Sequence, residues 1–221
     1  SKVSKLKLAV VKTLKEYIAN GGFLFTMCSA TDTYDIALAS QYTDICDVMY
    51  DGDPFDPDAN SKLDFTETIA LQNFSVELNP LVYKYSNIDI TQDLLTVGQY
   101  GDYFKIVDFS AKYDPVPSML TQCHTALVAG FLGQTSGFRK EFLKSNVVIL
   151  GMNEGTNLVK YIHGNYGKGT FTFLGGHDPE DYAHLVGAPA TELDKYPNSP
   201  GYRLILNNVL FPAAKKKKLK T

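Results

Sequence analysis

The stretch GGFLFTMCSATDTYD (residues 21–35) decides the fold. Its apolar run FLFTM (23–27) has the length and continuity of a strand that is covered on both faces. A helical pattern of apolar residues precedes it at 5–20, and a second follows at 31–42. Helix, strand, tight turn and helix in this order predict an α/β fold with a mostly parallel sheet.

The C-terminal part of the chain continues this pattern. NVVILGM (146–152) has the composition of a buried strand. The runs at 158–163 and 169–175 flank the glycine-rich turn GNYGKG and predict a hairpin. Residues 200–214 predict a closing helix, with Pro200 suited to its first turn.

The middle of the chain is less regular. Residues 51–64 are acidic and contain the Pro and Gly of a loop. The segments 65–78 and 94–110 could form paired strands, so that 51–115 would be an irregular, β-rich insertion. A helix is expected within 115–145, although glycines interrupt its pattern. We expect residues 1–221 to form one domain, with 215–221 as a solvated basic tail.

Composition narrows the class of protein. The net charge of −3 argues against nucleic acid as a partner, because phosphate binding needs concentrated Lys and Arg. No apolar run approaches the roughly 20 residues that span a bilayer. The three cysteines have no zinc or redox spacing. A cytoplasmic location is the default, and a periplasmic one would apply if an upstream signal had been removed.

Cys28 is the first candidate for chemistry. It stands where a strand ends and a helix begins, beyond the carboxyl end of a sheet, where open α/β folds bind ligands. A helix N-terminus favours a thiolate, and its free N–H groups can bind a developing oxyanion. The alternative is a structural thiol at a turn.

His177 is the second candidate. It directly follows another predicted strand, and Asp178 and Glu180 lie nearby to orient it. A general base needs such an exposed position and a carboxylate partner. The alternative is a loop histidine at a helix start that Asp178 caps. In a parallel sheet, the ends of both strands would lie on the same rim.

Other residues are weaker candidates. Asp51, Asp53, Asp56 and Asp58 offer the oxygen ligands of a hard cation, but their spacing does not match an EF-hand, and we expect no metal. GNYGKG (164–169) has neither Walker nor dinucleotide spacing, so no cofactor is predicted.

Two segments resemble the trehalose-utilization (ThuA-like) family. The first is GGFLFTMCSATDTYD (21–35), which is similar to that family's Gly-Gly, strand and His-Ser/Ala-Ala-Thr-Asp-Thr turn. The second is YGKG (166–169), the strand after it, GHDPE (176–180) and the closing helix. The family belongs to the class I glutamine amidotransferase-like superfamily, so the resemblance implies a flavodoxin-like three-layer sandwich.

The resemblance also implies roles for particular residues. Cys28 stands where the ThuA-like family usually has histidine, and working amidotransferases have cysteine there. It implies a Cys28–His177–Glu180 catalytic set, with ligand contacts at Ser29, Asp32 and Asp178. Amidotransferases have the acid two residues after the histidine, whereas Glu180 follows His177 by three.

Two functions remain open from these residues. One is hydrolysis or transfer of an amide or related carbonyl group in a small molecule. The other is a catalytically silent module that binds a sugar-like ligand or a partner protein.

The position of Cys28 carries one more expectation. In the superfamily, earlier strands precede this turn, whereas one predicted helix and one predicted strand precede Cys28 here. We therefore expect the sheet to lack N-terminal strands that a longer chain would supply. Its open edge would otherwise invite formation of a homodimer.

Overall fold

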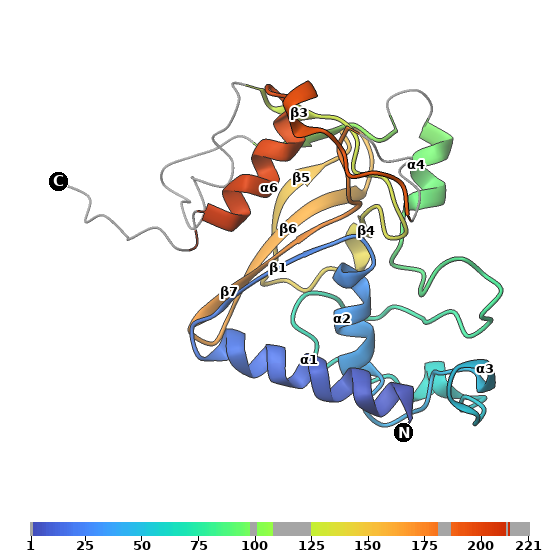
Figure 1. Ribbon diagram of the computed structural model, residues 1–221. Helices are drawn as coiled ribbons and strands as arrows, with labels where there is room; N and C mark the ends of the chain where they lie inside the picture. Colours follow the sequence, from blue (N-terminus) through green and yellow to red (C-terminus); the bar gives the residue numbers. More distant parts are fainter. Residues whose placement is uncertain (1, 98–100, 108–124, 181–186, 211, 213–221) are drawn as a thin grey trace.

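The computed structural model describes residues 2–97, 101–107, 125–180, 187–210 and 212 (Figure 1). The helices are α1 (Val3–Ala19), α2 (Ala30–Ala39), α3 (Val48–Asp51), α4 (Thr91–Val97) and α6 (Pro200–Leu210). The strands are β1 (Phe23–Met27), β2 (Phe104–Ile106), β3 (Leu127–Val128), β4 (Phe138–Arg139), β5 (Val148–Met152), β6 (Leu158–Tyr166) and β7 (Gly169–Leu174). Short 3-10 turns lie at Ala59–Lys62, Lys140–Phe142 and Leu193–Lys195.

The predicted helix–strand–helix unit is confirmed. α1 ends before Gly21, whose φ of 111° reverses the chain at no steric cost, and β1 covers residues 23–27 as predicted. α2 follows after the two residues Cys28 and Ser29. The predicted hairpin is also confirmed as β6 and β7, and the predicted closing helix as α6.

The described strands form one mixed sheet in the order β1-β7-β6-β5-β2-β3, with β4 paired to β6. Only β1 and β7 are parallel, and every other described pair is antiparallel. The prediction of a mostly parallel sheet is therefore wrong. Short connections explain this, because β6 and β7 are joined at Gly167 and Lys168, whereas parallel neighbours need a crossover of a dozen or more residues.

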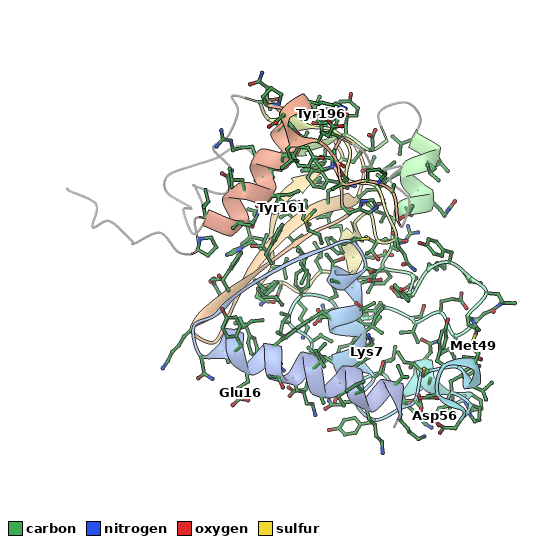
Figure 2. The ribbon with its side chains drawn as sticks, viewed as in Figure 1. Lys7, Glu16, Met49, Asp56, Tyr161 and Tyr196 are labelled. Atoms are coloured by element: carbon green, nitrogen blue, oxygen red, sulfur yellow. The ribbon has the colours of Figure 1, made fainter. Side chains whose placement is uncertain are left out.

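Apolar side chains form a core on each face of the sheet. On one face, α1 and α2 pack against Phe171 and Phe173. On the other face, α6 packs over Phe25 and Tyr161, and the Asn208 side chain donates a hydrogen bond to the Tyr161 hydroxyl (2.8 Å; Figure 2). The carboxyl ends of β1 and β7 thus lie between helices of both layers (Figure 1).

The middle of the chain differs most from the prediction. Residues 65–78 form isolated bridges instead of strands, and only β2 within 94–110 is a described strand. The described range 125–145 contains short strands and a 3-10 turn, so a helix there is wrong. Residues 115–124 and the tail 215–221 lie outside the described residues.

A buried carboxylate explains how an irregular segment is held against the core. Asp35 of α2 is fully buried and accepts hydrogen bonds from the backbone N–H groups of Ile69, Ala70 and Leu71 (2.7–2.9 Å). These donors need no strand partner because one side chain satisfies all three. Burial raises the pKa of Asp35 to about 6, and the three N–H groups oppose that shift.

None of the helices that the structure describes combines the length and apolar character needed to cross a bilayer.

Candidate functional site

Cys28 occupies a strained turn between β1 and α2. Its φ of 54° is one of the few positive values among non-glycine residues in the described chain. The Cys28 N–H donates to the Gly176 carbonyl (2.9 Å), and the Cys28 carbonyl accepts from the N–H and hydroxyl of Thr31 (3.1 and 2.6 Å). Backbone bonds on both sides therefore hold the residue in this conformation, with its side chain half-buried.

His177 lies on the same rim because β1 and β7 are parallel neighbours. Gly133 shows how close the two side chains are. A Cβ atom on Gly133 would lie 3.1 Å from Nε2 of His177 and 3.2 Å from Sγ of Cys28. The sulfur and the ring nitrogen are thus no farther apart than those two distances together, and only the bare Gly133 backbone fits beside them.

Gly133 belongs to a loop that we call the glycine loop (residues 130–137). It is fixed to the end of β7, where Gly176 N–H donates to the Thr135 carbonyl (2.8 Å) and His177 N–H to the Leu132 carbonyl (3.1 Å). Sequence reasoning assigned this segment to a helix. The glycines at 130, 133 and 137 were the available signal, because so many glycines disfavour a helix and permit close backbone approach.

The hydrogen bond at Nδ1 constrains the chemistry of His177. The backbone N–H of Asp178 donates to Nδ1 (2.7 Å), so Nδ1 is unprotonated and neutral His177 carries its proton on Nε2. That nitrogen is the one beside Cys28. In this tautomer Nε2 is a hydrogen-bond donor, and the structure records no hydrogen bond between it and the Cys28 sulfur. Accepting the thiol proton would require the other tautomer.

Neither predicted carboxylate orients the His177 ring through a described hydrogen bond. The Asp178 carboxylate accepts from the hydroxyls of Tyr202 and Thr191 and from the N–H of Glu180. No hydrogen bond among the described residues joins the Glu180 carboxylate to His177. The predicted Cys28–His177–Glu180 set is thus brought together only in its first two members.

The two residues predicted as ligand contacts beside Cys28 differ in exposure. Asp32 is fully buried and accepts from the hydroxyls of Thr135 (3.0 Å) and Ser86 (3.4 Å). Burial raises its pKa to about 7. Asp32 therefore fastens the glycine loop to α2. Ser29 is half-buried at the helix N-cap position, and its carbonyl accepts from Thr33.

A cavity of about 440 Å³ lies on the α6 side of His177. Its lining residues are Met27, His177, Asp178, Ala190, Thr191, Leu193, Tyr202 and Ile205. Apolar side chains from β1 and α6 line it together with a small polar group at Asp178, which suits a small-molecule ligand. Tyr202 and Thr191 were missed from the sequence because they become neighbours only when α6 folds back over the sheet.

The acidic loop lies away from this site. Asp44, Asp51 and Asp53 bring carboxylate oxygens within 4.8 Å of one another, but the Lys2 ammonium forms ion pairs with Asp44 and Asp53. Asp51 accepts from the first N–H of α1 (2.8 Å). These acids therefore hold the start of α1, and the Lys2 ammonium offsets part of their charge.

The remaining two candidate acids of the loop also have partners. Lys62 pairs with Asp58 (2.8 Å) and approaches Asp56 (3.7 Å), and Figure 2 shows Asp56 near the N-terminal end of α1, well away from Tyr161. The N–H of Asp44 and the hydroxyl of Thr43 lower the pKa of Asp56.

No protein-family model, curated protein or solved structure matches this chain.

Proposed function

We propose that the chain is a class I glutamine amidotransferase-like, ThuA-like domain whose Cys28 attacks an amide or related carbonyl carbon in a small molecule. One observation carries the proposal: Cys28 is held at φ 54° between a strand and a helix, beside Nε2 of His177. Strained positions of this kind cluster at active sites, where the strain presents a nucleophile. The flavodoxin-like part of the proposal is limited to β1, the turn at Cys28, α2 and the parallel neighbour β7, because the other described strand pairs are antiparallel.

The residues divide the reaction between them. The Cys28 thiolate forms the bond to the carbonyl carbon, and the carbonyl π electrons move onto its oxygen. Within the described residues, the N–H groups of Ser29 and Ala30 at the start of α2 have no backbone acceptor, so they can bind that oxyanion. The Nε2–H of His177 stabilises the thiolate before attack. The oxyanion then re-forms the carbonyl as the C–N bond breaks, and water supplies the proton for the leaving amine. A second water hydrolyses the thioester, which releases the acid and restores the Cys28 thiol.

Selective alkylation tests the nucleophile. At pH 7, iodoacetamide should label Cys28 at least about tenfold faster than Cys46, as measured by peptide mass spectrometry of a time course. Cys46 is a control within the same chain, because it is also half-buried while burial and nearby aspartates raise its pKa. Replacing His177 with Gln should slow labelling of Cys28 and leave Cys46 unchanged. Equal rates at the two cysteines would overturn the proposal.

The cavity supports a second function. Within the part of the chain that the structure describes, the hydrogen bonds to the Asp178 carboxylate come from Glu180, Thr191 and Tyr202, and His177 has no carboxylate partner, so the set is incomplete for proton transfer. A silent module would keep the cavity, in which the Tyr202 ring and the polar edge of Asp178 suit a sugar.

Ligand binding and turnover distinguish the two functions. The catalytic one predicts release of ammonia from L-glutamine that disappears in Cys28→Ser. The silent one predicts binding of a disaccharide such as trehalose, measured by saturation-transfer NMR, that persists in Cys28→Ser and is weakened by Tyr202→Ala. Trehalose binding that survives Tyr202→Ala would place the ligand outside this cavity.

A further inference from the structure

One edge of the sheet is open. Among the described residues, β1 pairs with β7 on one side and with no strand on the other. The Gly22 carbonyl accepts from Thr170 (3.1 Å) and the Cys28 N–H donates to Gly176 (2.9 Å). Backbone groups alternate in direction along a strand, so the even-numbered residues of β1 face β7.

The odd-numbered residues therefore present their backbone groups outward. These residues are Phe23, Phe25 and Met27, and Phe25 is the midpoint of the strand. Edge strands that avoid pairing are blunted by charges, Pro or bulges. FLFTM has none of these, so β1 retains the capacity to pair.

Helix α1 adds an apolar stripe beside this edge. The stripe consists of Val3, Leu6, Val10, Thr13 and Tyr17, whose positions are separated by three and four residues in turn. Leu6, Val10 and Tyr17 are 57%, 50% and 55% exposed. A three-and-four repeat is the pattern by which one helix packs lengthwise against another. A different face of α1, the one that points to the core, packs through Val11 and Ile18.

Two contacts show which way the stripe faces. The Lys15 ammonium lies over the Tyr166 ring (5.1 Å to the centroid), so that side of α1 points toward β6 and the sheet interior. The Tyr17 ring lies against Gly22, directly before β1. At 100° per residue, Leu6 and Val10 share the flank of Tyr17. The stripe thus faces outward over the open edge.

Most charges of α1 lie off the stripe. Lys5, Lys12 and Glu16 are exposed on another flank of the helix, whereas Lys7 is exposed at the border of the stripe, three residues before Val10. The stripe itself contains no charged residue, so two copies can meet along it with Lys7 at the rim of the contact. Across the sheet, α6 exposes Val209 (62%) one turn after Ile205, which packs against the core on that face and lines the cavity together with Met27 of β1.

We infer that a second copy of this chain occupies the open edge, forming a two-fold homodimer. β1 pairs antiparallel with the partner's β1, and Phe25 lies opposite the partner's Phe25. In this register the outward backbone N–H and C=O groups of all three odd-numbered residues lie opposite those of the partner strand and can form hydrogen bonds with them. A two-fold axis through Phe25, perpendicular to the sheet, also places the two α1 helices side by side on one face. Their stripes then meet at Val10, the midpoint of the repeat, so each surface is its own complement.

The oligomeric state tests the inference. Light scattering of the 221-residue chain between 5 and 200 µM should give twice the 24.4 kDa mass of one chain at the upper concentrations. Val10→Asp places two carboxylates at the centre of the interface and should give a monomer at 200 µM. Lys12→Asp is the matched control, because it adds a carboxylate to the exposed flank of the same helix and should leave a dimer.

Hydrogen exchange locates the interface within the dimer. The Phe25 amide should exchange at least about tenfold more slowly in the dimer than in Val10→Asp, since only the partner strand covers that group. A monomeric wild-type chain at 200 µM overturns the inference. So does a dimer that Val10→Asp leaves intact, or one in which the Phe25 amide exchanges as fast as in the variant.

Discussion

Replacing Gly176 with alanine is expected to remove at least about 4 kcal/mol from the free energy of unfolding, measured by urea denaturation. Gly176 has a φ of 79°, and a Cβ atom there would overlap the backbone carbonyl of Phe131. Backbone cannot move aside as the end of a side chain can, so the glycine loop must be displaced. Because folded domains have only about 5–15 kcal/mol in total, such a change threatens folding itself.

Gly155→Ala is the matched control for this effect. Gly155 has nearly the same φ, 77°, and a Cβ atom there would meet no other atom within 4 Å, so alanine meets backbone strain alone. That strain costs about 1–2 kcal/mol. The difference between the two variants isolates the steric term. A similar loss in both would mean that contact with Phe131 does not fix the glycine loop.

The Gly176→Ala substitution should also alter the candidate site. The glycine loop places Gly133 beside Cys28 and His177, and Gly176 anchors that loop through the Thr135 carbonyl. If Gly176→Ala still folds, the faster alkylation of Cys28 relative to Cys46 should therefore disappear.

Local patterns predicted the elements that carry the site. FLFTM gave the bounds of β1 because a short, continuous apolar run has few alternatives between a helix and a turn. The expectation that Cys28 and His177 share a rim needed only β1 and β7 to be parallel neighbours, and they are. The rest of the sheet could differ without affecting that placement.

Long-range contacts decided what sequence patterns could not. The run 65–78 has the composition of possible paired strands, yet its N–H groups at Ile69, Ala70 and Leu71 bind the Asp35 carboxylate from far earlier in the chain. The polar partners of Asp178 likewise come from Thr191 and Tyr202. No local period encodes such contacts, because each depends on how distant elements pack.

Lys160→Met is expected to stabilise the protein at neutral and lower pH. Lys160 of β6 is fully buried, and its ammonium donates to the Phe131 carbonyl (2.6 Å). Among the described residues no carboxylate pairs with it directly, and Asp102 and Asp89 compensate only in part. Burial lowers the pKa of Lys160 to about 7. Holding the charge inside thus costs about 5 kcal/mol at 1.36 kcal/mol per pH unit.

The net gain is smaller, because methionine leaves the Phe131 carbonyl without its donor, at about 1–2 kcal/mol. We expect Lys160→Met to raise the free energy of unfolding by roughly 3 kcal/mol at pH 6. Lys168→Met is the control, since Lys168 is exposed on the turn between β6 and β7 and should change stability little.

The pH dependence gives the sharper test. Between pH 7 and the ordinary lysine pKa of 10.5, unfolded chains bind a proton at Lys160 that folded chains do not. Wild-type stability from this group therefore rises with pH across that window and is lowest below pH 7. The advantage of Lys160→Met should be constant below pH 7 and shrink steadily toward pH 10. An advantage that is equal at pH 6 and pH 10 would show that the variant acts through packing, because a charge penalty must fall as the pH approaches 10.5, where the lysine of the unfolded chain also loses its proton.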